Sequence, residues 1–513
     1  MKPKHVFPGV RRQHGQTTLW FVAMLAACCC VLALVYNFGQ VANEKEKTVN
    51  AADASAISGA MIEARMLNFE AYTNRALIAN EVSIAQLVSL DSWVKYNYEI
   101  TQWLDNYFGW IPIVGQVLDL VANGMQAASE GVYAGVEIFI PVIEGMNTGL
   151  ESARDGVNLV GAVAANAVAG AVANANKTTF GSRYDEQPEE VDQVGGVGVL
   201  GAANVYAWSQ FTDAYSGDKR SDGRTVILNS RDPFSTHRGN GYLLDFINLS
   251  GAVPTLGGLL APYISIDKTS GSATLKDDYS DWEAQDSADL TLHHPGICGT
   301  FPFNYPCVQA DDMHVPFGYG RADADSDGST GDNLCWVSPA TTNCELALED
   351  NPDNFSWSGP YVQLSGDTGM PDIRDLADRA SKGDSCSKNN GSDSASLTFV
   401  SAVQKKGAAT LTTQRLGMNA DTPGPQGSPL MKDNLQNNDQ LTSIATACTF
   451  FLRPDLNKND RTQGLLARTD GVHEFASLYN PYWQARLGET DAVTKAALYT
   501  LIGANPALSV VTP

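Results

Sequence analysis

Hydrophobic and polar positions follow different spacings along the chain, and each spacing predicts a different element. Residues 17–38, TTLWFVAMLAACCCVLALVYNF, are predominantly apolar and contain no charged side chain. From 41 to 107 the chain has no proline, and apolar positions such as Ile57, Met61 and Ala64 recur every three or four residues. This periodicity predicts one or two long helices with one face built for packing.

Glycine and proline mark the end of that helical region. We expect the break at Gly109 and Pro112, because neither residue continues a helix well. Residues 113–175 are rich in Ala, Gly and Val. They predict further helices whose small side chains permit close approach between helices.

The remainder of the chain has a mixed pattern. From 178 to 455 it is rich in Gly, Asp, Ser, Asn, Pro and Trp, and short β-type runs such as Thr225–Leu228 and Tyr263–Ile266 are separated by turn signals. The tail returns to a helical pattern over 474–487 and 491–504. These runs predict a strand-containing domain followed by a helical tail.

The predicted fold class is α+β, with an N-terminal transmembrane helix that continues into long helices and then a mixed, disulfide-stapled exported domain. We expect five segments: a cytoplasmic N-terminus at 1–16, a transmembrane helix at 17–38, a helical stalk or bundle at 39–176, a mixed α/β periplasmic domain at 177–470 and a helical tail at 471–513.

The apolar run at 17–38 is long enough to cross a membrane. As a helix it would span roughly 33 Å at about 1.5 Å per residue, and the hydrocarbon core of a bilayer is about 30 Å thick. Four basic residues stand upstream, and no acidic residue precedes Glu44. Since basic flanks stay in the cytoplasm, we expect a single-pass protein of a bacterial inner membrane with its bulk in the periplasm. A cleaved secretory signal is the alternative, although its apolar region usually has only about 7–15 residues.

Composition narrows the class of protein. The chain has 513 residues, of which 43% are hydrophobic and 18% charged, so most of it is expected to fold. Its formal net charge is -23, which disfavours nucleic acid as a partner because binding a polyphosphate requires clustered Lys and Arg. An acidic chain suits an exported body or one that binds cations.

The nine cysteines agree with this topology. Cys28, Cys29 and Cys30 lie in the apolar run, where we expect reduced, apolar side chains. The other six follow it: Cys298, Cys307, Cys335, Cys344, Cys386 and Cys448. An even number in an oxidising compartment predicts three disulfides. The close spacings favour 298 with 307 and 335 with 344, leaving 386 with 448, although fifteen pairings are formally open. A zinc site is the alternative, but the six contain no C-x-x-C pair.

One acidic segment resembles a calcium loop. Asp323, Asp325 and Asp327 stand at positions 1, 3 and 5, followed by a glycine that permits the sharp turn. Leu334 occupies position 12, where an EF-hand carries glutamate, and Asp332 at position 10 is the nearest substitute. Calcium is the one cofactor that the sequence suggests; the alternative is a solvated acidic turn.

The N-terminal segment carries a recognisable combination of motifs. Arg11, Arg12, Gly15 and Gln16 form a basic R-R-x-x-G-Q entry to the apolar run. The helix that follows contains N-A-A-D-A-S-A, from Asn50 through Asp53 to Ala56. In order and spacing this segment resembles the N-terminal module of the TadE/TadG-like family of Tad/Flp pilus assembly.

The resemblance implies a non-enzymatic, membrane-anchored component of pilus assembly that supports adhesion and surface colonisation. Its partners would be other pilus-machine subunits, bound through the membrane helix and the stalk. Two features depart from the family: Trp20 stands where pilin-like members carry glutamate, and no D-x-S-x-S metal motif is present. Two alternatives are a membrane-tethered calcium-binding adhesin and a periplasmic hydrolase with an unrecognised site.

Overall fold

The computed structural model describes residues 16–176, 179–180, 199–214, 220–238, 263–293, 295–298, 305–308, 313–324, 362–377, 395–406, 440–453 and 474–488. The chain divides into two compact units that interleave along the sequence. Unit 1 comprises Met1–Asn68, Val157–Thr212 and Leu376–Pro513, and unit 2 comprises Phe69–Gly156 and Asp213–Asp375.

Two long helices dominate the described residues. Helix α1 runs from Gln16 to Phe108 and α2 from Val114 to Ala175. The five residues between them include Gly109 and Pro112, so the predicted helical regions and the predicted break are confirmed. The turn is tight, because a side chain at Gly115 would lie 1.8 Å from the carbonyl oxygen of Gly109.

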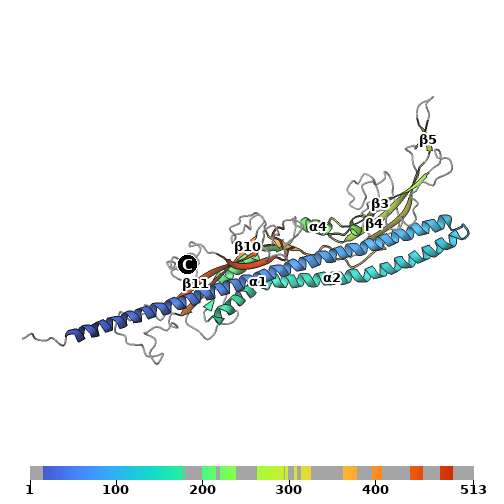
Figure 1. Ribbon diagram of the computed structural model, residues 1–513. Helices are drawn as coiled ribbons and strands as arrows, with labels where there is room; N and C mark the ends of the chain where they lie inside the picture. The colour runs from blue at the N-terminus through green and yellow to red at the C-terminus, as the bar shows by residue number, and fades with distance from the viewer. Residues whose placement is uncertain are drawn as a thin grey trace, which may run out of the picture. The chain divides into compact units, whose positions relative to one another are not determined.

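Unit 1 contains an antiparallel sheet. Its strands are β1 (Thr179–Phe180), β10 (Ser396–Lys406), β11 (Gln440–Phe451) and β12 (Trp483–Gly488), in that order across the sheet. Strands β10 and β11 lie along α1 in Figure 1. Helix α3 (Val199–Ser209) packs on β10 through Leu200, which contacts Ala402.

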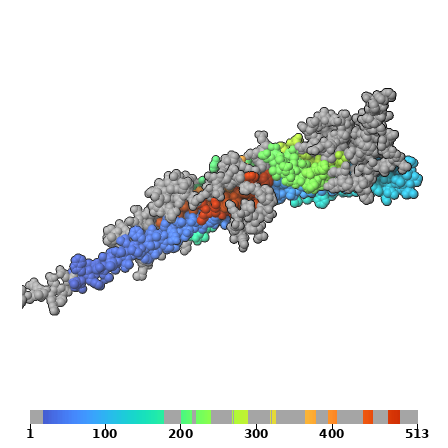
Figure 2. All heavy atoms as spheres, turned by 45° about the horizontal axis from the view of Figure 1, so that its top comes forward, coloured from blue at the N-terminus to red at the C-terminus, as the bar shows by residue number. Residues whose placement is uncertain are grey.

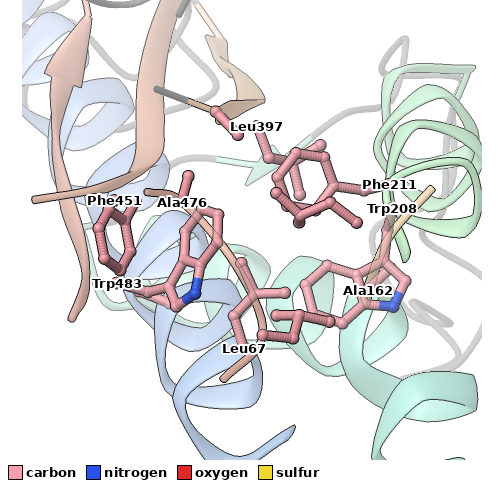
Figure 3. Close-up of a cluster of buried hydrophobic side chains, with 12 residues drawn as sticks. Leu67, Ala162, Trp208, Phe211, Leu397, Phe451, Ala476 and Trp483 are labelled. Atoms are coloured by element: carbon pink, nitrogen blue, oxygen red, sulfur yellow. The ribbon is translucent and has the colours of Figure 1, made fainter. Parts of the chain in front are cut away.

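The core of unit 1 joins this sheet to both long helices. A cluster of aromatic and aliphatic side chains includes Trp208, Phe211, Phe451 and Trp483, and Leu67 of α1 lies among them (Figure 3). The ring of Trp483 lies 5.7 Å from those of Phe211 and Phe451, in edge-on arrangements that favour aromatic pairs. Residues more than 400 positions apart in sequence therefore share one core.

Unit 2 contains a second sheet. Strands β3 (Tyr263–Leu275), β4 (Trp282–His293) and β7 (Met313–Asp323) are antiparallel neighbours, and β8 (Val362–Gln363) adds in parallel to β7. Helices α4 (Arg220–Asn229) and α5 (Pro233–Thr236) contact β3. Strands β5 (Pro295–Cys298) and β6 (Tyr305–Val308) form a two-stranded sheet, as do β2 (Thr212–Ala214) and β9 (Arg374–Leu376).

Two local predictions are wrong. Thr225–Leu228 belongs to α4 rather than to a strand: Ile227 is fully buried, and Arg224 donates to the carbonyl of Leu275 at 2.6 Å. Tertiary contacts here outweigh the β propensity of Thr, Val and Ile. In the expected tail helix, residues 483–488 form β12, beyond a turn at Leu478 and Tyr479. The strand at Tyr263–Ile266 is confirmed as part of β3, and 491–504 lies outside the described residues.

Candidate functional site

The first turns of α1 present apolar side chains on every side. Trp20 is 76% exposed, Leu32 is 68% and Phe38 is 74%, and in Figure 2 the dark-blue start of the helix is covered by no other coloured segment. None of the most apolar stretch of this helix is buried. By length and composition it is a candidate membrane span. Helix α2 is also long and apolar enough to cross a membrane, although a third of its most apolar stretch is buried.

A collar of charged side chains follows the apolar run. Glu44 lies 2.9 Å from Lys47 and also pairs with Lys405 of β10. Burial acts to raise the pKa of Glu44, but the hydrogen bonds from Lys405 and Lys47 outweigh it and hold the pKa below its ordinary value. Lys45 donates to the hydroxyl of Ser443 at 3.2 Å, and burial lowers the pKa of its ammonium group. The collar thus fastens the end of the β10–β11 pair to α1.

The N-A-A-D-A-S-A motif lies one turn further on and builds the interior of unit 1. Its alanines Ala51, Ala52 and Ala56 are buried. They pack in one hydrophobic cluster with side chains that are mostly small: Ala165, Ala169 and Ala173 of α2, and Phe399, Val403, Ala445 and Ala447 of the sheet. Small side chains let the backbones of two helices and a sheet approach closely, so the motif has a packing reason for its composition.

Polar groups fix the register of this contact. The Ser55 hydroxyl donates to the carbonyl of Ala169 at 2.8 Å and accepts from Ser401 at 2.9 Å, which ties α1 to α2 and to β10. Of the other motif residues, Asn50 is exposed and Asp53 is half-buried. Gly59 continues the same face, where a side chain would lie 2.4 Å from the ring of Phe399.

One carboxyl group is buried at the end of this face. Glu63 accepts a hydrogen bond from Thr449 of β11 at 3.1 Å, and the same hydroxyl lies 2.9 Å from the carbonyl of Ala60. Burial raises the pKa of Glu63 to about 8. Burial thus favours the protonated, neutral form of this carboxyl group.

This geometry coincides with a similarity to a known family. Residues 15–61 match the family described as putative Flp pilus-assembly TadE/G-like. The match is to the N-terminal segment alone, which we call the TadE/G-like segment. This TadE/G-like segment includes the candidate span, the charged collar and the alanine face up to Met61. No curated protein and no solved structure matches the chain.

The predicted motif residues divide between described and undescribed parts of the chain. Arg11, Arg12 and Gly15 precede the described residues, and Gln16 is the first residue of α1. The predicted recognition of the family is confirmed, since the matched range spans Gly15, Gln16, Asn50 and Asp53. The family match supports a role in pilus assembly.

The predicted calcium loop is only partly described. Asp323 ends β7, is 1% exposed, and pairs with Lys276 at 3.0 Å. Asp325, Asp327 and Asp332 lie outside the described residues, so the calcium site stays a prediction. Within the described part of the chain, no group of three or more His, Cys, Asp and Glu side chains could hold a metal ion.

The disulfide framework also stays a prediction. Cys28, Cys29 and Cys30 are free, as expected. Cys448 is buried in β11 and disulfide-bonded. Cys298 and Cys307 lie on the paired strands β5 and β6, and Cys335, Cys344 and Cys386 lie outside the described residues.

Sequence reasoning missed a cluster of acidic groups in unit 2. Glu81 accepts from the indole of Trp282 at 2.9 Å and from Asn147 at 3.0 Å, and Asp367 accepts from the backbone of Trp282 at 2.8 Å. Burial, followed by the charge of Asp367, raises the pKa of Glu81 well above its usual range. Burial also raises the pKa of Asp367 to about 7 and that of Glu144 above its ordinary value.

No local pattern marks this cluster, because its members come from α1, α2, β4 and the segment after β8.

Proposed function

We propose that the protein is a non-enzymatic, membrane-anchored component of Tad/Flp pilus assembly that supports adhesion and surface colonisation. The observation that carries the proposal is the position of the TadE/G-like segment. Its first half is the candidate membrane span, and its second half supplies the alanine face on which α2 and the sheet of unit 1 pack. One continuous helix thus links the candidate span to the folded core of unit 1.

The proposed topology places the N-terminus in the cytoplasm, the helix across the inner membrane and the bulk of the chain in the periplasm. Basic residues upstream of the apolar run support this direction. We expect the apolar side chains of 17–38 to contact membrane helices of other pilus-machine subunits. A reporter enzyme that is active only after export should work when fused after Pro513; activity of a strictly cytoplasmic reporter at the same position would contradict the topology.

The function is tested by removing the gene in frame, without disturbing its neighbours, and counting surface pili by electron microscopy. Lost or sharply reduced pili, restored by the wild-type gene in trans, is the expected result. Normal piliation would contradict the assembly role. A count of cells attached to an abiotic surface, made on the same strains, tests the adhesion part separately.

A further inference from the structure

The outward face of α2 in unit 2 has no partner among the described residues. Two rows of residues lie along this face, and within each row the residues are seven positions apart. The first row comprises positions 117, 124, 131, 138, 145 and 152, from Val117 to Ser152. The second comprises positions 121, 128, 135, 142, 149 and 156, from Val121 to Gly156. Every position in both rows except Ser152 is Val, Ile, Ala or Gly. We call these two rows the α2 seam. Its large members are exposed, Val117 by 57% and Ile138 by 65%.

The seam lies opposite the buried side of the helix. Ala122, Val136 and Ile140 are buried on the side that faces the rest of unit 2, where α1 runs beside α2 in Figure 1. Phe139 and Met146 flank the seam and are more than half exposed. The apolar surface is therefore a continuous face rather than a scatter of single side chains, and such faces mark binding sites.

Packing among the described residues does not explain the glycines of the seam. A side chain at Gly124, Gly131, Gly145 or Gly149 would meet no described atom within 4 Å. Each glycine inside a helix costs about 0.5–1 kcal/mol relative to alanine. Glycines on one helical face allow the backbone of a second helix to approach closely. Contact with a second helix would therefore explain glycine at these positions.

The repeat itself specifies the shape of the partner. Apolar positions that recur every seven residues, at alternating steps of four and three, stay on one side only when two helices coil around each other. We propose that the seam binds the same seam of a second copy of this chain.

Charge and area favour a second copy. The seam contains no charged side chain, so two copies meet without repulsion between like charges. From Val117 to Gly156 the seam is about 58 Å long and about 10 Å wide. Two copies would bury roughly 1,200 Å² in total, above the ~1,000 Å² that a specific interface requires.

A lipid surface fits this face less well. Helices that lie on membranes carry Lys and Arg on their polar side, and the first basic residue of α2 is Arg154. The acidic residues before it, among them Asp119 and Glu130, would be repelled by anionic lipid. The pairing proposed here is independent of the role in pilus assembly.

Cysteine cross-linking in native membranes tests the pairing. In the full chain carrying Cys28→Ala, Cys29→Ala and Cys30→Ala, we would introduce Ile138→Cys near the centre of the seam and add a short bis-maleimide. The matched control is Glu130→Cys, which is exposed on the same helix outside both rows. We expect a cross-linked dimer from Ile138→Cys and none from Glu130→Cys.

A second variant separates pairing from folding. Gly131→Glu with Gly145→Glu, added to Ile138→Cys, should abolish the cross-link while α2 stays helical, because glutamate favours a helix more than glycine does. Circular dichroism melting would confirm that the variant folds. No dimer from Ile138→Cys, equal dimer from Glu130→Cys, dimer that survives both glutamates, or an adduct with a different protein would each overturn the proposal.

Discussion

The two units use segments of the same two helices but bury different chemistry. In unit 1, α1 turns alanines and Leu67 toward aromatic and aliphatic side chains of the sheet. In unit 2, the interior holds charged groups: Asp286 lies 2.8 Å from Arg238 and 2.6 Å from Lys268, and neither Asp286 nor Arg238 is exposed. Ser92 of α1 donates to the same carboxylate at 2.8 Å.

This difference separates two ways of specifying an interior. An apolar interior depends on volume and shape, so it tolerates a change of pH and resists a change of side-chain size. A charged interior depends on complete pairing, since each ion left without its partner costs several kcal/mol. Unit 1 should therefore respond most to changes of size and unit 2 to changes of charge.

The largest effect is expected from Asp286→Ala. The substitution leaves Arg238 and Lys268 buried without their carboxylate, and breaking a buried pair in this way costs about 3–5 kcal/mol. Urea unfolding, followed by hydrogen exchange of unit 2 peptides, measures the loss. Asp277→Ala is the control, because this partner of Arg224 is 93% exposed and should cost less than about 1 kcal/mol. Equal losses from the two variants would contradict the role of the buried pair.

A smaller loss is expected from Ala56→Leu in unit 1. Ala56 is fully buried between α1, α2 and the sheet, and added methyl groups in a packed core cost about 1–3 kcal/mol. Hydrogen exchange of peptides from 41–63 and 396–406 measures it. Ala42→Leu on an exposed part of the same helix should leave exchange unchanged, and protection retained in Ala56→Leu would show that the face is not tightly packed.

The pH dependence of unit 2 comes next. The folded pKa values of Glu81, Glu144 and Asp367 are raised, so the folded state holds these protons more tightly than the unfolded state. Their contribution to stability is present at acidic pH and is lost as pH rises through about 7, the pKa of Asp367. Hydrogen exchange at pH 5 and pH 8, corrected for intrinsic rates, should show that peptides of unit 2 are less protected at the higher pH.

Asp367→Asn should flatten that pH dependence, because the amide cannot ionise. In unit 1 the pKa of Glu63 is also raised. The stability of unit 1 should therefore fall with rising pH as well, but less steeply than that of unit 2. An unchanged slope in Asp367→Asn would assign the pH response to other groups.

The smallest effect is expected at the charged collar. Lys405→Gln removes the ion pair with Glu44. Both side chains of this pair are partly exposed, and such pairs contribute about 0–1 kcal/mol to the free energy of unfolding. Thermal unfolding at low and high salt measures the loss, which should shrink as salt screens the pair. A loss as large as that of Ala56→Leu would mean that the collar, not the alanine face, fixes β10 to α1.

The long helices and the break between them could be predicted from the sequence, because their signals are local. Spacing of three and four residues marks α1, and Gly109 and Pro112 mark its end. The alanine motif could be found through the family resemblance, although its buried partners could not. Phe399 and Ala445 lie more than 300 residues away from it, and no local pattern pairs them with Ala52.

The errors have the same origin. The run Thr225–Leu228 favours a strand locally, but Ile227 is buried as part of a helix against the rest of unit 2. In the tail, the side-chain amide of Asn68 in α1 donates to the backbone carbonyl of Trp483 and accepts from its backbone N–H, each at 2.9 Å. These two hydrogen bonds favour the extended strand β12. Both outcomes depend on contacts across long sequence separations.

The most direct test of the assembly role exchanges the apolar run at 17–38 alone. In a strain lacking the gene, residues 17–38 would be replaced by an unrelated apolar span of equal length, with wild type as the control and hydrogen exchange confirming that the rest of the chain folds. The account predicts that wild type restores surface pili and that the chimera, although present and folded, does not. Normal piliation with the chimera would contradict the claim that this TadE/G-like segment acts in pilus assembly through its membrane helix.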